Sequence, residues 1–256
     1  DRQVRVWDVG TGEQLSEPMV PSSGRPNFAE FSPDDKFLLV GTDDGNVQIW
    51  DIASGKTVGS RHTAGGGKLI RAQYSADGKS ILVIGNRTAS VLDAKTGASR
   101  FKQGVQHESR LVIGGGGFNA DGSLFVTAGS DKTARIWDSM TEIKKGEPLV
   151  HPSEVTDAVF SRDGKHVATA SSDRMARFWD LATAKMLAEP MHHDRPINSI
   201  DLNPAGTILI AACDDATVRV WRTSTGQSGA EPLQHGSAVE SAHFSDDGRL
   251  VVSYEK

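Results

Sequence analysis

The stretch VTDAVFSRDGKHVATASSDRMARFWD, residues 155 to 180, contains the pattern that decides the fold. VTDAVF and KHVATAS are β-branched or alternating apolar runs, which is typical of strands, and the Asp-Gly pair between them indicates a hairpin turn. A polar turn, SSDR, leads into a third run, MARFWD. LATAKML supplies a fourth, which we expect to end before Pro190, because proline cannot donate to a strand ladder. Together these runs predict one small antiparallel sheet.

The same pattern recurs through the whole chain, which is the first property to establish in any sequence. Trp-Asp pairs begin at Trp7, Trp50, Trp137 and Trp179, and degenerate copies begin at Leu92 and Trp221. A second marker, of which FSPDDKFLLVG at residues 31–41 is one copy, also occurs six times. A four-stranded sheet cannot bury both of its faces alone, but copies stacked around an axis can. The sequence therefore predicts an all-β propeller of six four-stranded antiparallel blades.

Composition narrows the classes of protein that remain. The chain has 256 residues, a formal net charge of -5, and 37% hydrophobic residues with 27 glycines, which suits a turn-rich β protein. The absence of a basic excess argues against a nucleic-acid partner, and no apolar run is long enough to span a membrane. Cys213 is the single cysteine, so an intrachain disulfide framework is excluded, and we expect a reducing, cytoplasmic location.

The repeats resemble those of WD-repeat (WD40) β-propellers across the whole chain. In that family a turn Asp, a loop His, a strand Ser or Thr and a Trp brace each blade; a carboxylate accepts an imidazole N–H and the indole packs beneath. The resemblance implies a structural bracing role for fourteen residues of this sequence: Asp1, Trp7, Asp44, Trp50, His107, Asp131, Trp137, His151, Asp173, Trp179, His193, Asp215, Trp221 and His235.

Two repeats depart from this pattern. In the copy ending at Leu92, Asn86 replaces the Asp and Leu92 the Trp, although His62 is present, so we expect its bracing to be the weakest. In the copy before Trp50, we expect Ser22 or Ser23 at the position of the His.

The chain begins inside its own repeat, because Asp1 lies six residues before Trp7. VVSYEK, residues 251–256, followed by DRQVRVWD, residues 1–8, reads as an uninterrupted repeat, and a blade shared by both termini would remove two free edges. We therefore expect one propeller domain over residues 1–256, in which His235 braces against Asp1 and Trp7. Its blades would be roughly 21–61, 62–106, 107–150, 151–191, 192–234, and 235–256 with 1–20. Excision from a longer array would leave the same ends, and we expect the chain to be part of a longer polypeptide.

A search for catalytic chemistry favours a protein that is not an enzyme and carries no catalytic residues, metal or cofactor. The run GGGGF at residues 114–118 lacks the Lys-Ser/Thr of a phosphate-binding loop, and we expect a β-bulge there. Cys213 follows an apolar strand and is expected to be a core thiol. His192 and His193 are adjacent, so on a strand they point to opposite faces, which disfavours a metal site.

Four arginines, Arg5, Arg135, Arg177 and Arg219, stand two residues before a Trp. They could form a ring for an acidic partner. We favour the alternative in which each guanidinium lies across its own strand or the neighbouring blade.

Partners of WD-repeat propellers usually dock where loops enter the first strands and around the bracing Asp. Residues that differ from blade to blade in these loops define a predicted rim: Asp43, Arg110, Ser130, Glu154, Ser172, Arg195 and Asp214. Its mixed charge suits a protein or peptide. The spacers SEPMVP, GEPLVHP, AEPMHH and AEPLQH resemble those of bacterial WD-repeat proteins whose arrays often follow a kinase or another signalling module.

These observations predict a non-catalytic protein-interaction scaffold, the docking or sensor propeller of a larger bacterial signalling protein. A self-contained six-bladed adaptor is the alternative. A propeller hydrolase is the third hypothesis, and clustered carboxylates in the central channel would favour it.

Overall fold

The computed structural model describes residues 2–65, 67–101, 104–107 and 111–255. Asp1, Arg110 and Lys256 lie outside them. The chain divides into a first unit, residues 1–106, and a second unit, residues 107–256. The regular elements in the described residues are all strands, which confirms the predicted all-β class. Within the same residues, no helix is long and apolar enough to cross a membrane.

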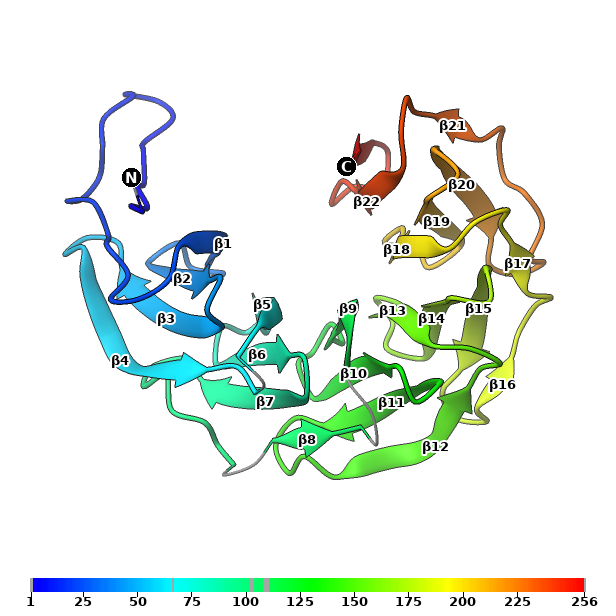
Figure 1. Ribbon diagram of the computed structural model, residues 1–256, viewed down its shortest axis with the longest axis horizontal. Coiled ribbons are helices and arrows are strands. Elements are labelled where there is room, and N and C mark those ends of the chain that lie inside the picture. Colours follow the sequence, from blue (N-terminus) through cyan, green and yellow to red (C-terminus); the bar gives the residue numbers. More distant parts are fainter. Residues whose placement is uncertain (1, 66, 102–103, 108–110, 256) are drawn as a thin grey trace. The chain divides into compact units, whose positions relative to one another are not determined.

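The first unit contains two complete four-stranded antiparallel sheets (Figure 1). Each sheet follows chain order, from the first strand to the fourth. Ahead of them, residues 4–19 fold back on themselves, with bridges between Val4 and Met19 and between Trp7 and Gln14. The strands are β1 (Pro26–Phe31), β2 (Phe37–Thr42), β3 (Asn46–Asp51), β4 (Lys56–Thr63), β5 (Leu69–Tyr74), β6 (Ser80–Gly85), β7 (Thr88–Asp93) and β8 (Val105–Gln106).

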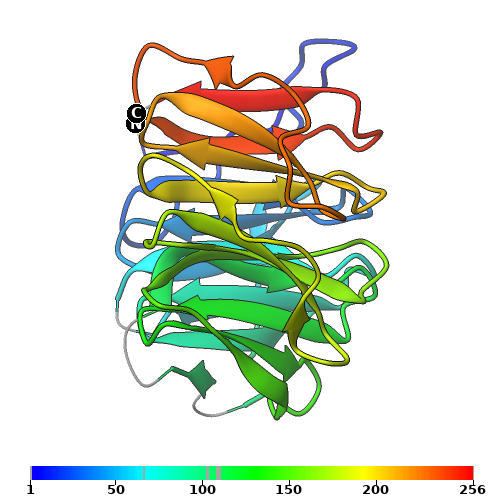
Figure 2. The ribbon, with the colours of Figure 1, turned by 90° about the vertical axis from the view of Figure 1, so that its right-hand side faces the viewer.

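The second unit contains three sheets of the same design and a final pair, β22 and β23 (Figure 1). Figure 2 shows these sheets from the side, stacked face to face. The strands are β9 (Leu111–Phe118), β10 (Leu124–Gly129), β11 (Thr133–Asp138), β12 (Lys144–Val150), β13 (Val155–Phe160), β14 (His166–Ser171), β15 (Met175–Asp180), β16 (Lys185–Met186), β17 (Met191–His192), β18 (Ile197–Leu202), β19 (Ile208–Cys213), β20 (Thr217–Arg222), β21 (Leu233–Gln234), β22 (Val239–Phe244) and β23 (Val251–Glu255).

The core of each unit lies between neighbouring sheets, because the second and third strands carry apolar residues on both faces. Every residue of β6 is buried, as are five of the six residues of β14. Between the sheets that begin with β13 and β18, Phe178 and Leu209 pack among small residues such as Ala168 and Ala211. Small side chains let two sheets approach closely. The resulting close packing holds these strands, and the brace residues that they carry, in place.

Each first strand carries a register shift against its second strand. The shift is largest in β9, where Gly116 pairs with Thr127 and Leu111 pairs with Gly129. Gly116 has a φ of 132°, which glycine tolerates far better than other residues. The predicted bulge in the glycine run is therefore confirmed.

The fourth strand of the sheet that begins with β13 differs from the prediction. It does not end before Pro190 but is interrupted there: β16 and β17, on either side, both pair with β15. A proline removes one ladder hydrogen bond, and the strand resumes once the ring has been passed.

The last sheet of the second unit has two strands, and the first unit begins with a folded-back segment that is not part of a four-stranded sheet. A blade completed from both termini, and a total of six blades, stay predictions.

Candidate functional site

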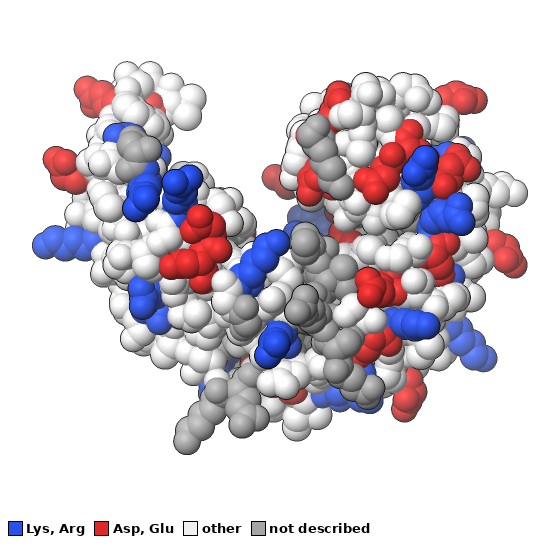
Figure 3. All heavy atoms as spheres, in the orientation of Figure 1, with Lys and Arg blue, Asp and Glu red and all other residues white. Residues whose placement is uncertain are grey.

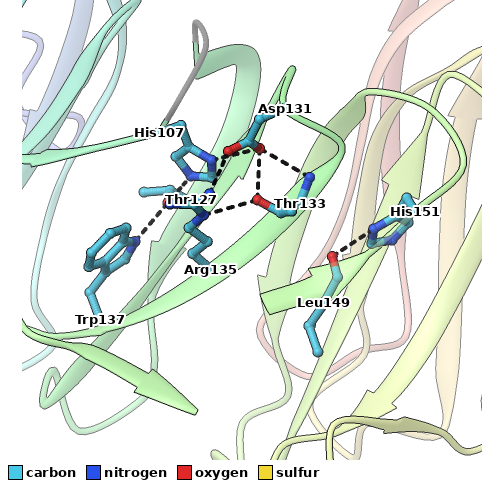
Figure 4. A network of polar contacts seen from close by, with 8 residues as sticks. All are labelled: His107, Thr127, Asp131, Thr133, Arg135, Trp137, Leu149 and His151. Atoms are coloured by element: carbon cyan, nitrogen blue, oxygen red, sulfur yellow. Dashed lines mark hydrogen bonds and ion pairs between the residues drawn. The ribbon is translucent and has the colours of Figure 1, made fainter. Parts of the chain in front are cut away.

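The most complete brace lies around His107 in the second unit (Figure 4). His107 Nδ1 lies 3.0 Å from Asp131 Oδ1, and its Nε2 lies 2.7 Å from Thr127 Oγ1. Trp137 Nε1 donates to the same hydroxyl oxygen at 2.8 Å. Thr133 anchors the carboxylate, donating from its hydroxyl at 2.7 Å. One turn, one loop and two strands are thereby joined.

The donors and acceptors in this network assign the state of the imidazole. Asp131 can only accept, so His107 Nδ1 carries the proton and Nε2 accepts from Thr127. Burial lowers the pKa of His107, which keeps the ring neutral. Burial alone would raise the pKa of Asp131, but hydrogen bonds from Thr133 and His107 outweigh it and hold the pKa below its usual value.

The brace around His151 differs in its carboxylate contact. His151 Nε2 meets Thr169 Oγ1 at 2.8 Å, and Trp179 Nε1 donates to that oxygen at 2.8 Å. Its Nδ1, however, donates to the carbonyl oxygen of Leu149 at 2.9 Å, not to Asp173 as expected. Asp173 is held by both terminal nitrogens of Arg177, at 3.1 and 2.7 Å, so its carboxylate is already engaged.

The last two histidines form reduced versions of the brace. At His193 the hydroxyl is missing, because Ala211 occupies the position of Thr169, and Trp221 Nε1 donates directly to His193 Nε2 at 3.0 Å. His235 Nε2 lies 2.9 Å from Ser253 Oγ. Its predicted partner Asp1 lies outside the described residues, and Trp7 is 55% exposed within its own unit. Bracing across the termini stays a prediction.

Three of the four arginines that stand two residues before a Trp belong to the brace, which the sequence analysis missed; for Arg5, the expected partner Asp1 lies outside the described residues. The nearest distances to the bracing carboxylates are 2.8 Å for Arg135–Asp131, 2.7 Å for Arg177–Asp173 and 3.1 Å for Arg219–Asp215. Residues four apart on a strand share a face, so the recurring Asp-x-x-x-Arg spacing could have revealed these pairs. These three guanidinium groups lie across their own strands, as favoured, and each forms an ion pair with its bracing carboxylate. Arg219 also forms an ion pair with the exposed Asp194.

In the first unit, strand pairing places different residues at the two His positions. The third-strand residue three positions after the bracing Asp pairs with a residue of the fourth strand, and the bracing His stands two residues after that partner. In the last copy, Val218 pairs with Leu233, and His235 follows two residues later. In the N-terminal segment Met19 pairs with Val4, so the equivalent position is Pro21. The expectation of Ser22 or Ser23 is therefore wrong.

The role expected of His62 is also wrong. His62 pairs with Val47, and the His position is Ala64, whose N–H donates to Gly45 O at 2.7 Å. A constant spacing of fourteen residues from Trp7 to Pro21 and from Trp50 to Ala64, as from Trp179 to His193, was the signal available in the sequence.

The two first-unit blades respond to this loss in different ways. Around Leu92 the His, Thr and Trp positions are all apolar: Ala64, Val83 and Leu92 are buried together in one cluster with Ile81. Around Trp50 only the partners are lost. Val40 stands at the position of Thr127, and the buried Nε1 of Trp50 has no hydrogen-bond partner among the described residues. The blade around Leu92, whose sequence departs most from the pattern, thus leaves no indole N–H without an acceptor, whereas the blade around Trp50 does.

Three of the predicted rim residues form a backbone hydrogen bond to a residue that precedes a first strand, and one of these partners, Glu154, is itself a predicted rim residue. The backbone N–H groups of Asp43, Ser172 and Asp214 donate to the carbonyl oxygens of Arg25, Glu154 and Pro196 respectively. Each pair thus joins the turn beside a bracing Asp to the loop that enters a first strand. Arg195 is exposed and precedes Pro196, Ser130 is half-buried in the corresponding turn, and Arg110 lies outside the described residues.

Acidic and basic side chains are interspersed on the face of the second unit that Figure 3 shows. The backbone pair is the same in the three sheets that begin with β1, β13 and β18, whereas the side chains it presents differ. The rim therefore combines a recurring backbone hydrogen bond, which we call the backbone frame, with side chains that vary.

Carboxylates on the first strands serve a structural purpose. Asp157, which is 3% exposed, accepts from Ile200 N at 3.1 Å, and Asp201 accepts from Phe244 N at 2.9 Å. In the first unit Glu30 accepts from Tyr74 N at 3.0 Å. Each joins a first strand to the first strand of the next sheet. A hydrolase needs carboxylates that are available to substrate, and these three are engaged.

His193, Cys213 and Asp215 form a cluster whose potential ligand atoms all lie within 4.8 Å of one another. His193 Nε2 accepts from Trp221, so in the neutral ring Nδ1 carries the proton and has no lone pair for a metal. The Cys213 thiol donates to Arg195 O at 3.3 Å, and burial raises its pKa to about 11, whereas a metal needs the thiolate. This chemistry favours a core cluster over a metal centre or a nucleophile.

The sheets and their His–Thr–Trp and Asp–Arg contacts define the chain as a WD-repeat β-propeller protein. A family model for the WD domain, G-beta repeat, matches residues 23–51, and a model described as nucleolar protein 10-like, N-terminal domain, matches residues 80–256. The chain belongs to this family of nucleolar protein 10-like N-terminal propeller domains. No curated protein matches it. WD-repeat propellers generally mediate protein–protein interaction and are typically non-catalytic scaffolds.

Proposed function

We propose that this chain is a non-catalytic scaffold that binds a protein or peptide at its rim. The observation that carries the proposal is the constant backbone frame at Arg25–Asp43, Glu154–Ser172 and Pro196–Asp214, which presents different side chains in each blade. A shared frame with variable side chains provides specificity without new backbone structure. A net charge of -5 supports a protein partner over a nucleic acid or a membrane surface.

Site-specific crosslinking tests this proposal. A photoreactive residue at Glu154, at the start of β13, should capture a protein in cells of the source organism. The matched control is Lys165, which is also exposed but lies in the turn beyond the other end of β13. Capture from position 165 alone, or equal capture from both positions, would contradict a rim-binding scaffold.

We further propose that the scaffold is the cytoplasmic docking or sensor part of a larger bacterial signalling protein. The recurring Glu-Pro-Met/Leu spacer supports this context. Sequencing the complete gene tests it: a kinase-like or other signalling segment in the same reading frame is expected. A reading frame that encodes the propeller alone would instead favour a self-contained adaptor.

A further inference from the structure

A pocket in the first unit lies beside Trp50, where the brace has lost its polar partners. Pro21 replaces the imidazole, Val40 replaces the threonine, and Gln48 replaces the arginine found in three blades of the second unit. The pocket is lined by these three residues together with Ser22, Ser23 and Arg61, among others. Pro21 and Gln48 are smaller than the imidazole and the guanidinium that they replace, whereas Val40 is as large as a threonine but has no hydroxyl.

Two donors are available at this pocket. Trp50 is only 6% exposed, and its Nε1–H has no acceptor among the described residues. Arg61 is exposed, and one of its terminal nitrogens donates to Ser22 Oγ and Ser23 Oγ at 3.3 and 3.1 Å. Among the described residues its remaining N–H groups have no partner, so they can donate a charge-assisted hydrogen bond to one oxygen of a carboxylate.

The nearby carboxylate of Asp44 does not fill this role. It accepts from the hydroxyl of Thr42 at 2.5 Å and from Asn46 N at 3.4 Å, and the hydroxyl of Ser23 also donates to it. The bond from Thr42 is the main cause that lowers the pKa of Asp44 to about 2. Asp44 is thus engaged by three neighbouring donors. The Trp50 N–H and the Arg61 guanidinium therefore need an acceptor from another molecule.

The size of the pocket limits what can enter. The space open to the centre of a water-sized atom is about 10 Å³, which is close to the minimum for one oxygen atom. A carboxylate could place one oxygen against Trp50 Nε1 and leave the other at the mouth with Arg61. An imidazole or a larger ring would not fit.

We propose that this pocket binds the carboxylate of an acidic side chain on the partner protein. The inference rests on the proposed scaffold function and names the chemistry of one contact. Its first donor, Trp50, is buried and fixed by packing, and its second, Arg61, is a cation at the surface. An acidic partner segment supplies the acceptor that the missing hydroxyl and imidazole supply elsewhere.

Formate, the smallest carboxylate, is the probe. The full chain has five tryptophans, and Trp50→Phe assigns the Trp50 indole N–H signal in a ¹H–¹⁵N spectrum. Sodium formate should shift that signal in a saturable way, whereas sodium chloride at equal ionic strength should not. The signals of Trp137 and Trp179, whose N–H groups already donate to threonines, should stay in place.

Two variants test the donors. Arg61→Gln should weaken formate binding by roughly tenfold or more, the loss expected for one hydrogen bond to a charged group. Lys56→Gln removes an exposed charge from the same strand and should leave binding unchanged. Val40→Thr should abolish the shift, because its hydroxyl oxygen would accept the Trp50 N–H.

A Gly-Glu-Gly peptide with blocked ends distinguishes a protein side chain from a free anion. It should shift the Trp50 signal at lower concentration than its Gly-Gln-Gly counterpart. Equal behaviour of the two peptides would overturn the assignment to a partner side chain. A Trp50 signal that formate does not move would show that the pocket holds water only. A signal that moves equally in the wild-type chain and in Arg61→Gln would overturn the role of Arg61 as the second donor. Crosslinking at Glu154 in the second unit is independent of this result, so the two failures are distinguishable.

Discussion

In the second unit, the indoles of Trp137, Trp179 and Trp221 donate to a hydroxyl or an imidazole. In the first unit, Leu92 replaces one indole, and the Trp50 indole N–H has no acceptor in the part of the chain that the structure describes. A hydrogen-bonded network removed as a whole leaves a well-packed apolar cluster, as around Leu92. A network removed in part leaves a buried donor, which is costly. Partial loss of the network, and not total loss, therefore leaves a buried donor that a ligand could satisfy.

The largest expected effect is that of removing a satisfied indole. Trp179→Ala should lower the free energy of unfolding by about 3–5 kcal/mol, because the variant loses a large buried side chain and leaves a cavity. Urea unfolding followed by circular dichroism measures this. Met140→Ala, which truncates an exposed side chain, should change it by less than about 0.5 kcal/mol. An unchanged urea midpoint for Trp179→Ala would show that the indole does not brace its blade.

Acid should destabilise the second unit before the first. Burial lowers the pKa of both His151 and His193 from 6.5 to about 4, so between these values the unfolded chain binds more protons. Stability is therefore fully present above about pH 6.5 and falls as the pH is lowered towards about 4, by about 1.4 kcal/mol per pKa unit and histidine.

Hydrogen exchange at about pH 5, compared with neutral pH, tests this difference. Peptides from β14, β15, β19 and β20 should lose protection. Those from β2 and β3 should lose less, since Pro21 and Ala64 do not titrate and His62, whose pKa burial also lowers, is the single histidine of residues 1–106. Equal losses in both units would contradict the role given to the buried histidines.

Removing one hydroxyl should have an intermediate effect. Thr169→Val leaves both His151 Nε2 and Trp179 Nε1 without a partner and should cost about 1–3 kcal/mol in thermal unfolding. Thr169→Ser keeps the hydroxyl and should recover most of that loss. If serine and valine destabilise equally, packing of the methyl group, and not the hydrogen bonds, decides the stability at this position.

The smallest effect should be a gain. Val40→Thr places a hydroxyl where the other blades have Thr127 or Thr169 and gives Trp50 an acceptor, so we expect about 0.5–1.5 kcal/mol of added stability. The same substitution at Val83, in the apolar blade, should destabilise because the new hydroxyl is buried without a partner. A loss at position 40 as large as that at position 83 would mean that Trp50 does not need an acceptor.

The sequence predicted the repeat and the hairpins, because both are encoded by spacing within one copy, and the resemblance to WD-repeat propellers implied the pairing of His107 with Asp131. It misplaced the histidine positions before Trp50 and Leu92. Ser22 and Ser23 are polar, as a histidine is, but the Val4–Met19 bridge places Pro21 at the His position, and the register of β4 shifts His62 away from the position of Ala64. His151 donates to the carbonyl oxygen of Leu149 because the carboxylate of Asp173 is already bound by Arg177. Residue spacing alone does not show which of the two side chains binds Asp173.

The carboxylates of Asp157 and Asp201 have a further consequence for solubility. The exposed edge of a strand is a template on which another chain can add a strand and start aggregation. The N–H groups of Ile200 and Phe244 lie on first strands, and an internal carboxylate already occupies each of them. An incoming peptide would have to displace a charged acceptor before it could extend either sheet. These residues therefore protect the folded chain from edge-to-edge association, and a partner gains more by contacting side chains at the rim than by adding a strand.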